Sequence, residues 1–332
     1  MTHIPPSLHP QELVAAGLFV GAIAAVYLFA IRALIRLGLE RRGHRPAPTL
    51  RQRRLRWVLF VVAGFGVVCI AYGCFIEPYW PDVTHVRIDS AKLPPGGRPI
   101  RIVHFSDLHC DPRPRLESRL PDLITAQHPD LILYTGDSLN SPKGLPILRE
   151  LLTRLAAIAP TIVVRGNWDV WFWNGLNLFG GTGVLELNGQ VVPIRVDRTV
   201  LWVAGSAVDD ETGIARALQR IPTGAFTILA YHYPDEIERV AARGDVDLYC
   251  AGHTHGGQIA LPGYGALLTC SRFGKRYEAG LYRVGSTWLY VNRGIGMEGG
   301  FAPRARFCAR PELTVIEIAP EAHASPPPPG AR

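Results

Sequence analysis

The chain opens with two long apolar stretches separated by a polar loop. Leu13–Ile31 and Trp57–Ile76 contain no charged residue, and each is about as long as a helix that crosses the hydrocarbon core of a bilayer. A cleaved signal peptide explains the first stretch less well, because no basic residue precedes it and no second span would then be expected. Buried core helices of this length would carry polar interruptions. The pattern therefore predicts two transmembrane helices.

Downstream of these stretches, the period of the hydrophobic positions changes. A Pro-rich neck at Glu77–Pro81 and a second break at Pro94–Pro99 come first. From Arg101 onward, short apolar runs typical of buried strands alternate with helical patterns. We expect strands at Ile102–Phe105, Leu131–Tyr134 and Thr161–Val164, and helices at Pro114–Gln127 and Leu145–Ile158. This alternating order predicts a parallel sheet covered by helices.

The second half of the chain contains more strands and fewer helices. Val184–Leu187 and Val191–Val196 flank Asn188-Gly189, a favourable hairpin turn. Further elements are expected as a helix near Glu211–Arg220 and strands at Val200–Ala204, Phe226–Tyr231, Leu248–Cys250, Gly280–Val284, Trp288–Asn292 and Leu313–Ile318. These patterns predict a mixed or antiparallel sheet.

The expected fold class is α/β, with two mixed β-sheets packed face to face, flanked by helices and preceded by two transmembrane helices. Residues 1–82 are expected to form a membrane anchor, with helices at about 13–31 and 57–76 and an Arg-rich loop at 32–56. Residues 83–319 then form the folded domain. The last residues, 320–332, are rich in Pro and Ala and are expected to be disordered.

Positive charge is concentrated in the loop between the two apolar stretches. The 332-residue chain has a formal charge of +7, and the segment from Arg32 to Arg56 holds nine Arg and one Glu, a local charge of +8. The other residues therefore sum to −1, which gives no support to a nucleic-acid partner. Because basic loops stay in the cytoplasm, the folded domain is expected on the outer, periplasmic face of a bacterial-type inner membrane.

The cysteines show no metal-binding spacing. Of the six, two lie in the second apolar stretch and four are scattered without a CxxC pair, namely Cys110, Cys250, Cys270 and Cys308. This pattern excludes a zinc ribbon. If the domain is exported, Cys270 and Cys308 could form a disulfide.

Residues of the metal-binding type follow the ends of successive expected strands. They lie in Ser106-Asp107-Leu108-His109, Gly136-Asp137, Gly166-Asn167-Trp168-Asp169, the single His232, and Gly252-His253-Thr254-His255-Gly256. The carboxyl ends of the strands are where open α/β sheets place their ligands, and glycines let the backbone turn sharply there. Other histidines, such as His85 and His128, are taken as structural.

These ordered motifs resemble those of the calcineurin-like metallophosphoesterases, over roughly Ile100 to Ile318. The resemblance implies a sandwich of two mixed sheets and hydrolysis of a phosphoester or phosphoanhydride by two divalent metal ions. It implies a first metal site made of Asp107, His109 and His255. It implies a second metal site made of Asn167, His232 and His253, with Asp137 bridging the two ions. Catalytic roles are implied for Asp137, Asn167, Asp169 and His253.

The chemistry of these residues agrees with that implication. Mixed oxygen and nitrogen ligands suit Mn, Zn or Fe ions better than Ca²⁺. A carboxylate such as that of Asp137 can bridge two ions because its oxygens offer several lone pairs. Two ions about 3.5–4 Å apart acidify the water between them and neutralise phosphoryl oxygens, so that hydroxide attacks phosphorus in line with the leaving oxygen.

Trp168 departs from the pattern that it resembles, in which a histidine usually occupies this position. The indole has an N–H donor and no proton that titrates. Loss of a general acid costs about 10²–10⁴-fold, mostly for poor leaving groups such as alkoxides, and least for phosphoanhydrides. In the alternative, His104 or a metal-bound water supplies the proton.

Two further groups of residues have two interpretations each. The aromatic run that begins at Trp168 and includes Trp171, Phe172 and Trp173 is either core or an apolar wall for a lipid tail or the membrane surface. Three arginines near the end of the chain either contact a phosphate or are solvated, which we favour; they are Arg293, Arg304 and Arg306.

The segments Gly274–Leu281, Tyr290–Gly296 and Pro303–Leu313 resemble the branch of that family with N-terminal membrane segments. Some members of the branch are UDP-2,3-diacylglucosamine pyrophosphatases of lipid A synthesis or lipid-linked phosphodiesterases. The resemblance implies a phosphorylated small-molecule or lipid-linked envelope substrate, with membrane lipid as a partner. The pyrophosphatase activity is one alternative, and a binding or signalling module that keeps its metals but is catalytically impaired is another.

Overall fold

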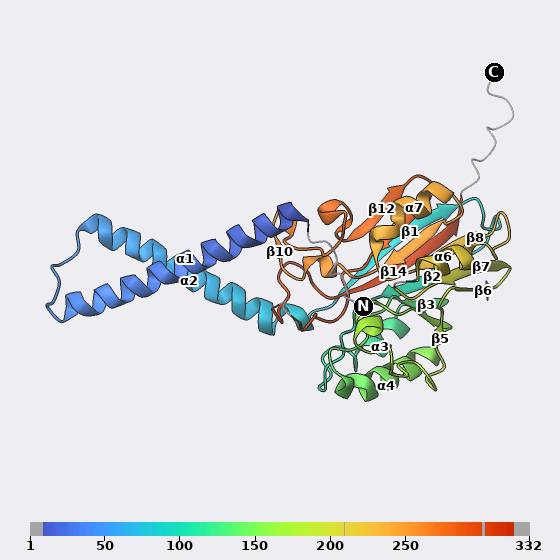
Figure 1. Cartoon of the computed structure of the whole chain (residues 1–332), viewed down its shortest axis with the longest axis horizontal. Coiled ribbons are helices and arrows are strands. Elements are labelled where there is room, and N and C mark those ends of the chain that lie inside the picture. Colours follow the sequence, from blue (N-terminus) through green and yellow to red (C-terminus); the bar gives the residue numbers. More distant parts are fainter. Residues whose placement is uncertain (1–8, 209, 301–302, 322–332) are drawn as a thin grey trace, which may run out of the picture.

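In the computed structural model, which describes residues 9–208, 210–300 and 303–321, a helical hairpin projects from a globular domain (Figure 1). The hairpin consists of α1, Pro10–Arg41, and α2, Leu50–Phe75. Both helices are long and apolar enough to cross a membrane, and only 6% and 11% of their most apolar stretches are buried. They are therefore not core helices of the domain.

The first sheet of the domain has six strands in the order β1-β14-β2-β3-β4-β5. Strands β2 to β5 are parallel to one another, whereas β14 is antiparallel to β2 and parallel to β1. The strands are β1 Asp82–Ser90, β2 Ile100–Phe105, β3 Leu131–Tyr134, β4 Thr161–Val163, β5 Leu185–Glu186 and β14 Glu312–Pro320. The helices between them are α3 Leu120–Thr125, α4 Leu145–Ala156 and α5 Asn167–Trp171.

The second sheet also has six strands, in the order β12-β13-β9-β8-β7-β6. Its inner pairs are parallel and its outermost pairs are antiparallel. The strands are β6 Gln190–Val196, β7 Thr199–Gly205, β8 Phe226–Ala230, β9 Leu248–Ala251, β12 Gly280–Val284 and β13 Thr287–Val291. The helices are α6 Glu211–Leu218 and α7 Ile237–Arg243, and a short ribbon contains β10 Ala260–Leu261 and β11 Gly265–Ala266. Single 3₁₀ turns lie at Glu77–Tyr79, Pro142–Gly144, Pro234–Glu236, His255–Gly257 and Gly274–Tyr277.

Three apolar clusters hold these layers together. Leu133 of the first sheet and Ile228 of the second belong to the cluster between the two sheets. A second cluster joins the outer face of the first sheet to α3 and α4, and a third joins the outer face of the second sheet to α6 and α7. Because both faces of each sheet are covered, the inner strands have continuous apolar runs in their sequence. The α/β class with two mixed sheets flanked by helices is confirmed.

The hairpin predicted at Asn188-Gly189 is wrong. β5 pairs in parallel with β4 in the first sheet, whereas β6 pairs with β7 in the second. Leu187 is buried in the cluster between the sheets, so the chain crosses from one sheet to the other where the local sequence favours a turn. Tertiary burial overrides the turn signal here.

Three other boundaries differ from expectation. β1 was not predicted, because it is a half-exposed edge strand with no continuous apolar run. The helix predicted at Pro114–Gln127 is limited to α3. Pro320, placed in the disordered tail, is the last residue of β14 and pairs with Ser90. The tail residues from 322 onward lie outside the described residues.

Candidate metal centre

The motif residues gather where the carboxyl ends of β2, β3 and β4 of the first sheet meet those of β8 and β9 of the second. Five of them have positive φ angles, namely Asp107 (52°), His109 (42°), Asp137 (60°), His253 (73°) and His255 (53°). Residues with a side chain rarely adopt this left-handed conformation, and it is found at functional sites held in place by their surroundings. The sheets therefore hold these loops in a strained but fixed arrangement.

One group of side chains consists of Asp107, His109 and His255. All three are buried, and each has a ligand atom within 4.8 Å of those of the other two. His255 Nε2 lies 3.4 Å from Asp107 Oδ1 and 3.2 Å from His109 Nε2. Such a triad of one carboxylate and two imidazoles suits a transition-metal ion. The structure thus brings together the three residues that the motifs assign to the first ion.

A second group consists of Asp107, Asp137 and His232, also buried and within 4.8 Å of one another. His232 Nε2 lies 3.3 Å from Asp137 Oδ2 and 3.9 Å from Asp107 Oδ1. Its other ring nitrogen, Nδ1, lies 2.7 Å from the Thr135 carbonyl oxygen. A bond from Nδ1–H to a carbonyl fixes the tautomer and leaves Nε2 free to bind metal. Asp107 is common to both groups, and Asp137 Oδ2 also lies 3.6 Å from His109 Nε2 of the first group.

Asn167 and His253 complete the set expected for the second ion. Asn167 begins α5 and is buried, and its Oδ1 has no hydrogen-bond partner among the described residues. A buried acceptor without a partner is costly unless a cation or water satisfies it. The main-chain amide of His253 donates to Asp107 Oδ2 at 3.1 Å, and its Nε2 lies 3.1 Å from the Cys270 carbonyl. Its Nδ1 is the nitrogen left for a ligand, so the donor set fits two divalent ions.

The electrostatics of the centre follow from this close packing. Burial disfavours the charged form of His232, but the carboxylates of Asp137 and Asp107 outweigh it and raise the pKa of His232 to about 9. Burial together with His232 lowers the pKa of His253 to about 3. Burial opposes ionisation of Asp107, yet the imidazoles of His255, His232 and His109 hold its pKa below the usual range. The carboxylates therefore attract a cation strongly.

Asp169 has contacts typical of a positioning residue. Its carboxylate accepts hydrogen bonds from the main-chain amides of Asp137 at 2.9 Å, Ser138 at 2.8 Å and Gly166 at 3.0 Å. Burial and the nearby Asp137 raise the pKa of Asp169 to about 6. These contacts tie the loop after β3 to the loop after β4. These contacts suit a residue that positions Asp137, and the catalytic role that the motif implies stays a prediction.

Two motif glycines are required by close approach. A Cβ atom on Gly166 would lie 2.2 Å from Asp137 Oδ1, and one on Gly252 would lie 2.4 Å from Asp107 Oδ2. Both distances are far inside contact range. The glycines therefore leave room for the two carboxylates, besides allowing the chain to turn.

The aromatic run divides into a core part and a rim part. Trp173 packs against the core of the first sheet and donates from Nε1 to the Leu139 carbonyl at 2.8 Å. Trp168 lies edge-on to His109, with ring centroids 5.1 Å apart, and against Phe172 at 5.0 Å. Phe172 is 57% exposed. The core interpretation thus holds for Trp173, whereas Trp168 with Phe172 forms an apolar wall beside the centre.

The solvated interpretation of the three late arginines is wrong for Arg306. This side chain is fully buried and donates to the carbonyls of Gly296 at 2.8 Å, Ala309 at 2.8 Å and Arg293 at 2.9 Å. Burial lowers its pKa to about 9. Arg293 is half-buried and pairs with Asp82 and Glu312, and Arg304 pairs with Asp111.

Two sequence-based suggestions about nearby residues change with the structure. His104 is fully buried, with Nε2 3.0 Å from Thr135 Oγ1, and burial lowers its pKa to about 3. It is therefore not placed to protonate a leaving group. Cys270 and Cys308 are free thiols, so the disulfide is not formed. Glu298, near the centre, was not predicted as a site residue. Burial raises the pKa of this half-buried carboxyl, and the carboxylates of Asp137 and Asp107 raise it further.

The comparisons with known proteins agree with this geometry. The family model described as calcineurin-like phosphoesterase matches residues 100–257. The uncharacterized metallophosphoesterase YkuE of Bacillus subtilis (strain 168) is 33% identical over 74% of this chain and 88% of its own length. The phosphodiesterase YaeI of Escherichia coli (strain K12) is 30% identical over 77% of this chain and 93% of its own. A transmembrane protein with metallophosphoesterase domain from Danio rerio is 28% identical over 89% of this chain and 70% of its own length.

The chain belongs to the calcineurin-like metallophosphoesterase family. It is therefore a hydrolase of phosphoesters, with a centre for the divalent metals that the family uses and with two helices suited to membrane association.

Proposed function

We propose that this chain is a two-pass membrane enzyme that cleaves a phosphodiester or pyrophosphate bond of a lipid-linked or envelope substrate with two divalent ions. The convergence of the two buried donor groups on Asp107 and Asp137 carries the proposal. In it, residues 1–82 form the anchor and residues 83–319 the catalytic domain.

The proposed ligands of the first ion are Asp107, His109 and His255. Those of the second ion are Asn167, His232 and His253, and Asp137 is shared by both. The ions supply Lewis acidity and lower the pKa of water to the neutral range. Nitrogen and oxygen donors of this kind favour Mn, Zn or Fe.

The protein's own residues hold the reacting groups in place. Asp137 Oδ1 accepts a hydrogen bond from the Trp168 amide at 2.8 Å, and this bond with the Asp169 contacts fixes the shared carboxylate. The tautomer of His232 is fixed by Thr135. Burial of the centre excludes bulk water and strengthens its electrostatic interactions with a phosphoryl group. Trp168 covers one side of the centre without offering a proton.

Contacts of the anchor with the domain support a substrate at the membrane surface. Thr269 Oγ1 donates to Glu12 Oε1 of α1 at 2.7 Å, only one residue before Cys270, whose carbonyl contacts His253. Glu77, just after α2, accepts from the amide of Cys308 at 3.0 Å. The membrane-proximal loops of the domain are therefore the ones that contact the ligand loops. With the apolar wall of Trp168 and Phe172, they favour a substrate that bears a lipid.

The function is tested by hydrolysis of bis(p-nitrophenyl) phosphate by the purified chain with added Mn²⁺. Metal-dependent turnover supports the enzyme, and a chain that binds two ions yet turns over nothing would support the impaired binding module instead. Assays with lipid extracts and with nucleotide-sugar lipids then distinguish a lipid substrate of the outer face from UDP-2,3-diacylglucosamine. The latter is favoured by one observation, the lack of a titratable acid at Trp168, because a phosphate leaving group needs little protonation.

A further inference from the structure

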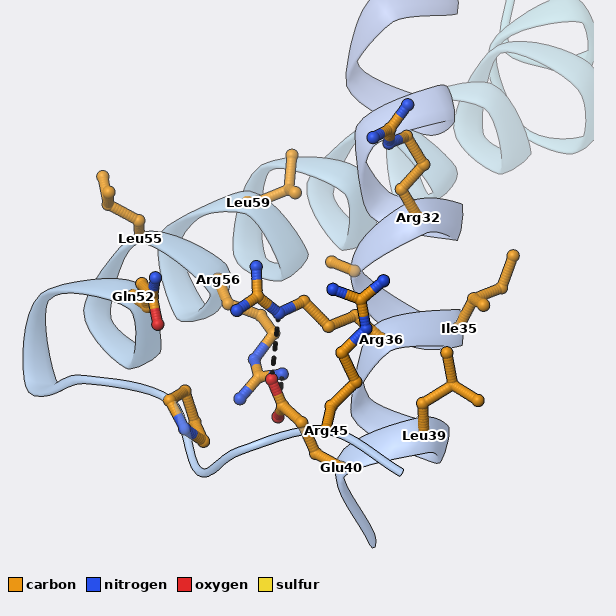
Figure 2. Close-up of a pocket in the computed structure, with 12 residues that line it drawn as sticks. Arg32, Ile35, Arg36, Leu39, Glu40, Arg45, Gln52, Leu55, Arg56 and Leu59 are labelled. Atoms are coloured by element: carbon orange, nitrogen blue, oxygen red, sulfur yellow. Dashed lines mark hydrogen bonds and ion pairs between the residues drawn. The ribbon is translucent and has the colours of Figure 1, made fainter. Parts of the chain in front are cut away.

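A charged cavity lies at the end of the helical hairpin, between Arg32 and Leu59 in the sequence. It has a volume of about 490 Å³, is open on one side, and is lined by the last turns of α1, the connecting loop and the first turns of α2 (Figure 2). A cavity of this size is within the range that holds small ligands. Four arginines and one glutamate line it, Arg32, Arg36, Arg45, Arg56 and Glu40.

The arginines of this cavity exceed its carboxylate by three charges. Glu40 accepts from Arg36 Nε at 3.1 Å and from Arg56 Nη1 at 2.9 Å, as the dashed lines of Figure 2 mark. Arg32 and Arg45 have no ion pair among the described residues. The ion pairs therefore hold two guanidinium groups in place between the helices, and two more remain free for an anion.

The position of the cavity relative to the apolar stretches limits what its anion can be. Arg32 directly follows the first apolar stretch and Arg56 directly precedes the second, so these two arginines mark the boundaries of the proposed spans. Leu59, inside the second stretch, and Leu55 line the same cavity. An occupant here meets both cationic and apolar side chains, and Leu59 is the lining residue inside the second apolar stretch.

An anionic phospholipid combines a charged head group with apolar chains and therefore suits such a mixed lining. Guanidinium groups bind phosphate oxygens through two parallel hydrogen bonds, which an ammonium group cannot form, and the segment from Arg32 to Arg56 has nine Arg and no Lys. Basic pockets between transmembrane helices are suited to anionic head groups. We propose that this cavity binds the phosphate head group of an anionic phospholipid, with an acyl chain along Leu59, which lies inside the second apolar stretch.

The inference rests on the proposal that α1 and α2 span the bilayer, and not on the hydrolase chemistry. It holds for whichever leaflet faces the connecting loop. Retention of the chain in membrane pellets after an alkaline carbonate wash checks the spanning helices separately, so failure of the anchor and failure of the lipid site are distinguishable.

The test uses the full-length, delipidated protein in detergent and native mass spectrometry. Phosphatidylglycerol, phosphatidylcholine with the same acyl chains, and inorganic phosphate are titrated separately. The tested variant is Arg32→Ala/Arg45→Ala. Its control, Arg51→Ala/Arg53→Ala, removes the same charge from exposed positions of the same segment that do not line the cavity.

We expect phosphatidylglycerol to be retained at least about tenfold more tightly than phosphatidylcholine. The cavity variant should weaken this binding roughly thirtyfold, as for two guanidinium contacts near a membrane surface, and the control less than about threefold. Equal losses in the two variants would overturn the proposal, because the basic segment would then act only through its net charge. Equal retention of the two lipids, or full competition by inorganic phosphate at concentrations equal to the lipid, would also overturn it. Hydrolysis of a soluble diester by both variants confirms that they are folded.

Discussion

The main-chain amide of Arg306 donates a hydrogen bond to the Gly73 carbonyl at 2.9 Å, so the residue that is buried beneath the metal centre is joined to the end of α2. Its guanidinium donates to the carbonyls of Gly296 and Gly294, and the Gly296 amide donates to the Asp107 carbonyl at 2.6 Å. A short chain of contacts therefore connects α2 with the loop that carries Asp107.

Arg306→Met is expected to weaken metal binding and turnover roughly 10- to 100-fold, as is usual when support of metal ligands is removed. The substitution leaves several buried carbonyls without donors. Titration of the metal-free protein with Mn²⁺, followed by turnover at saturating metal, measures the effect. Arg304→Met is the control, because Arg304 pairs at the surface with Asp111. An unchanged Mn²⁺ affinity in Arg306→Met contradicts the positioning role.

Asp137→Asn is expected to lower turnover by orders of magnitude and to reduce the metal content. One neutral amide replaces a carboxylate shared by both ions, so both sites and the water between them are weakened. Elemental analysis and hydrolysis of bis(p-nitrophenyl) phosphate give the two readouts. Asp89→Asn, at an exposed position of β1, should change neither. Full metal content with near-parental turnover in Asp137→Asn would refute the assignment of the bridge.

The convergence of the motif residues could be predicted from the sequence because Asp, Asn and His next to glycines at strand ends are both chemical and structural signals. Residues whose role depends on tertiary burial left no such signal. Leu187 is apolar in either a hairpin or a crossover, and only its burial between the sheets selects the crossover. Arg306 lies in a polar stretch, where an arginine is normally solvated, and β1 has the half-exposed pattern of an edge strand.

Trp168→His is expected to raise turnover of alkyl phosphodiesters relative to pyrophosphates. An imidazole can protonate an alkoxide leaving group, which contributes about 10²–10⁴-fold in general acid catalysis, whereas a phosphate leaving group gains little. The ratio of kcat/KM values for the two substrate classes is the measurement. Trp168→Phe is the matched control, since it keeps an aromatic ring and adds no acid. If the ratio in Trp168→His equals that of the parent, a missing proton does not limit the reaction.

The buried His104 should make the domain less stable at mildly acidic pH. Its pKa is about 3 in the folded state and about 6.5 in an unfolded chain, so below pH 6.5 the unfolded chain binds a proton that the folded one does not. The contribution of the neutral His104 to the free energy of unfolding is therefore fully present above pH 6.5 and is lost as the pH falls toward 3. In His104→Asn, the slope of the unfolding free energy between pH 6 and 4 should decrease by up to about 1.4 kcal/mol per pH unit.

Chemical denaturation of the metal-saturated protein at several pH values gives this slope, whatever the substitution does to stability at pH 7. His85→Asn, which removes an exposed histidine from β1, should leave the slope unchanged. Parallel slopes for His104→Asn and the parent would show that His104 does not titrate below its usual range.

The charge of the proposed anchor predicts its topology. The segment from Arg32 to Arg56 has a charge of +8, and translocating it would be strongly disfavoured. Since α1 and α2 form a hairpin whose loop lies away from the domain (Figure 1), a cytoplasmic loop requires the domain to be on the outer face. Alkaline phosphatase fused after Arg332 in a bacterial host should be active, and a fluorescent protein fused there should be dark. Replacing the nine arginines by glutamine should reduce this bias, whereas the same number of substitutions in the domain should not. The reverse pattern of the two fusions would place the catalytic centre in the cytoplasm, and would make a nucleotide-sugar lipid the better substrate.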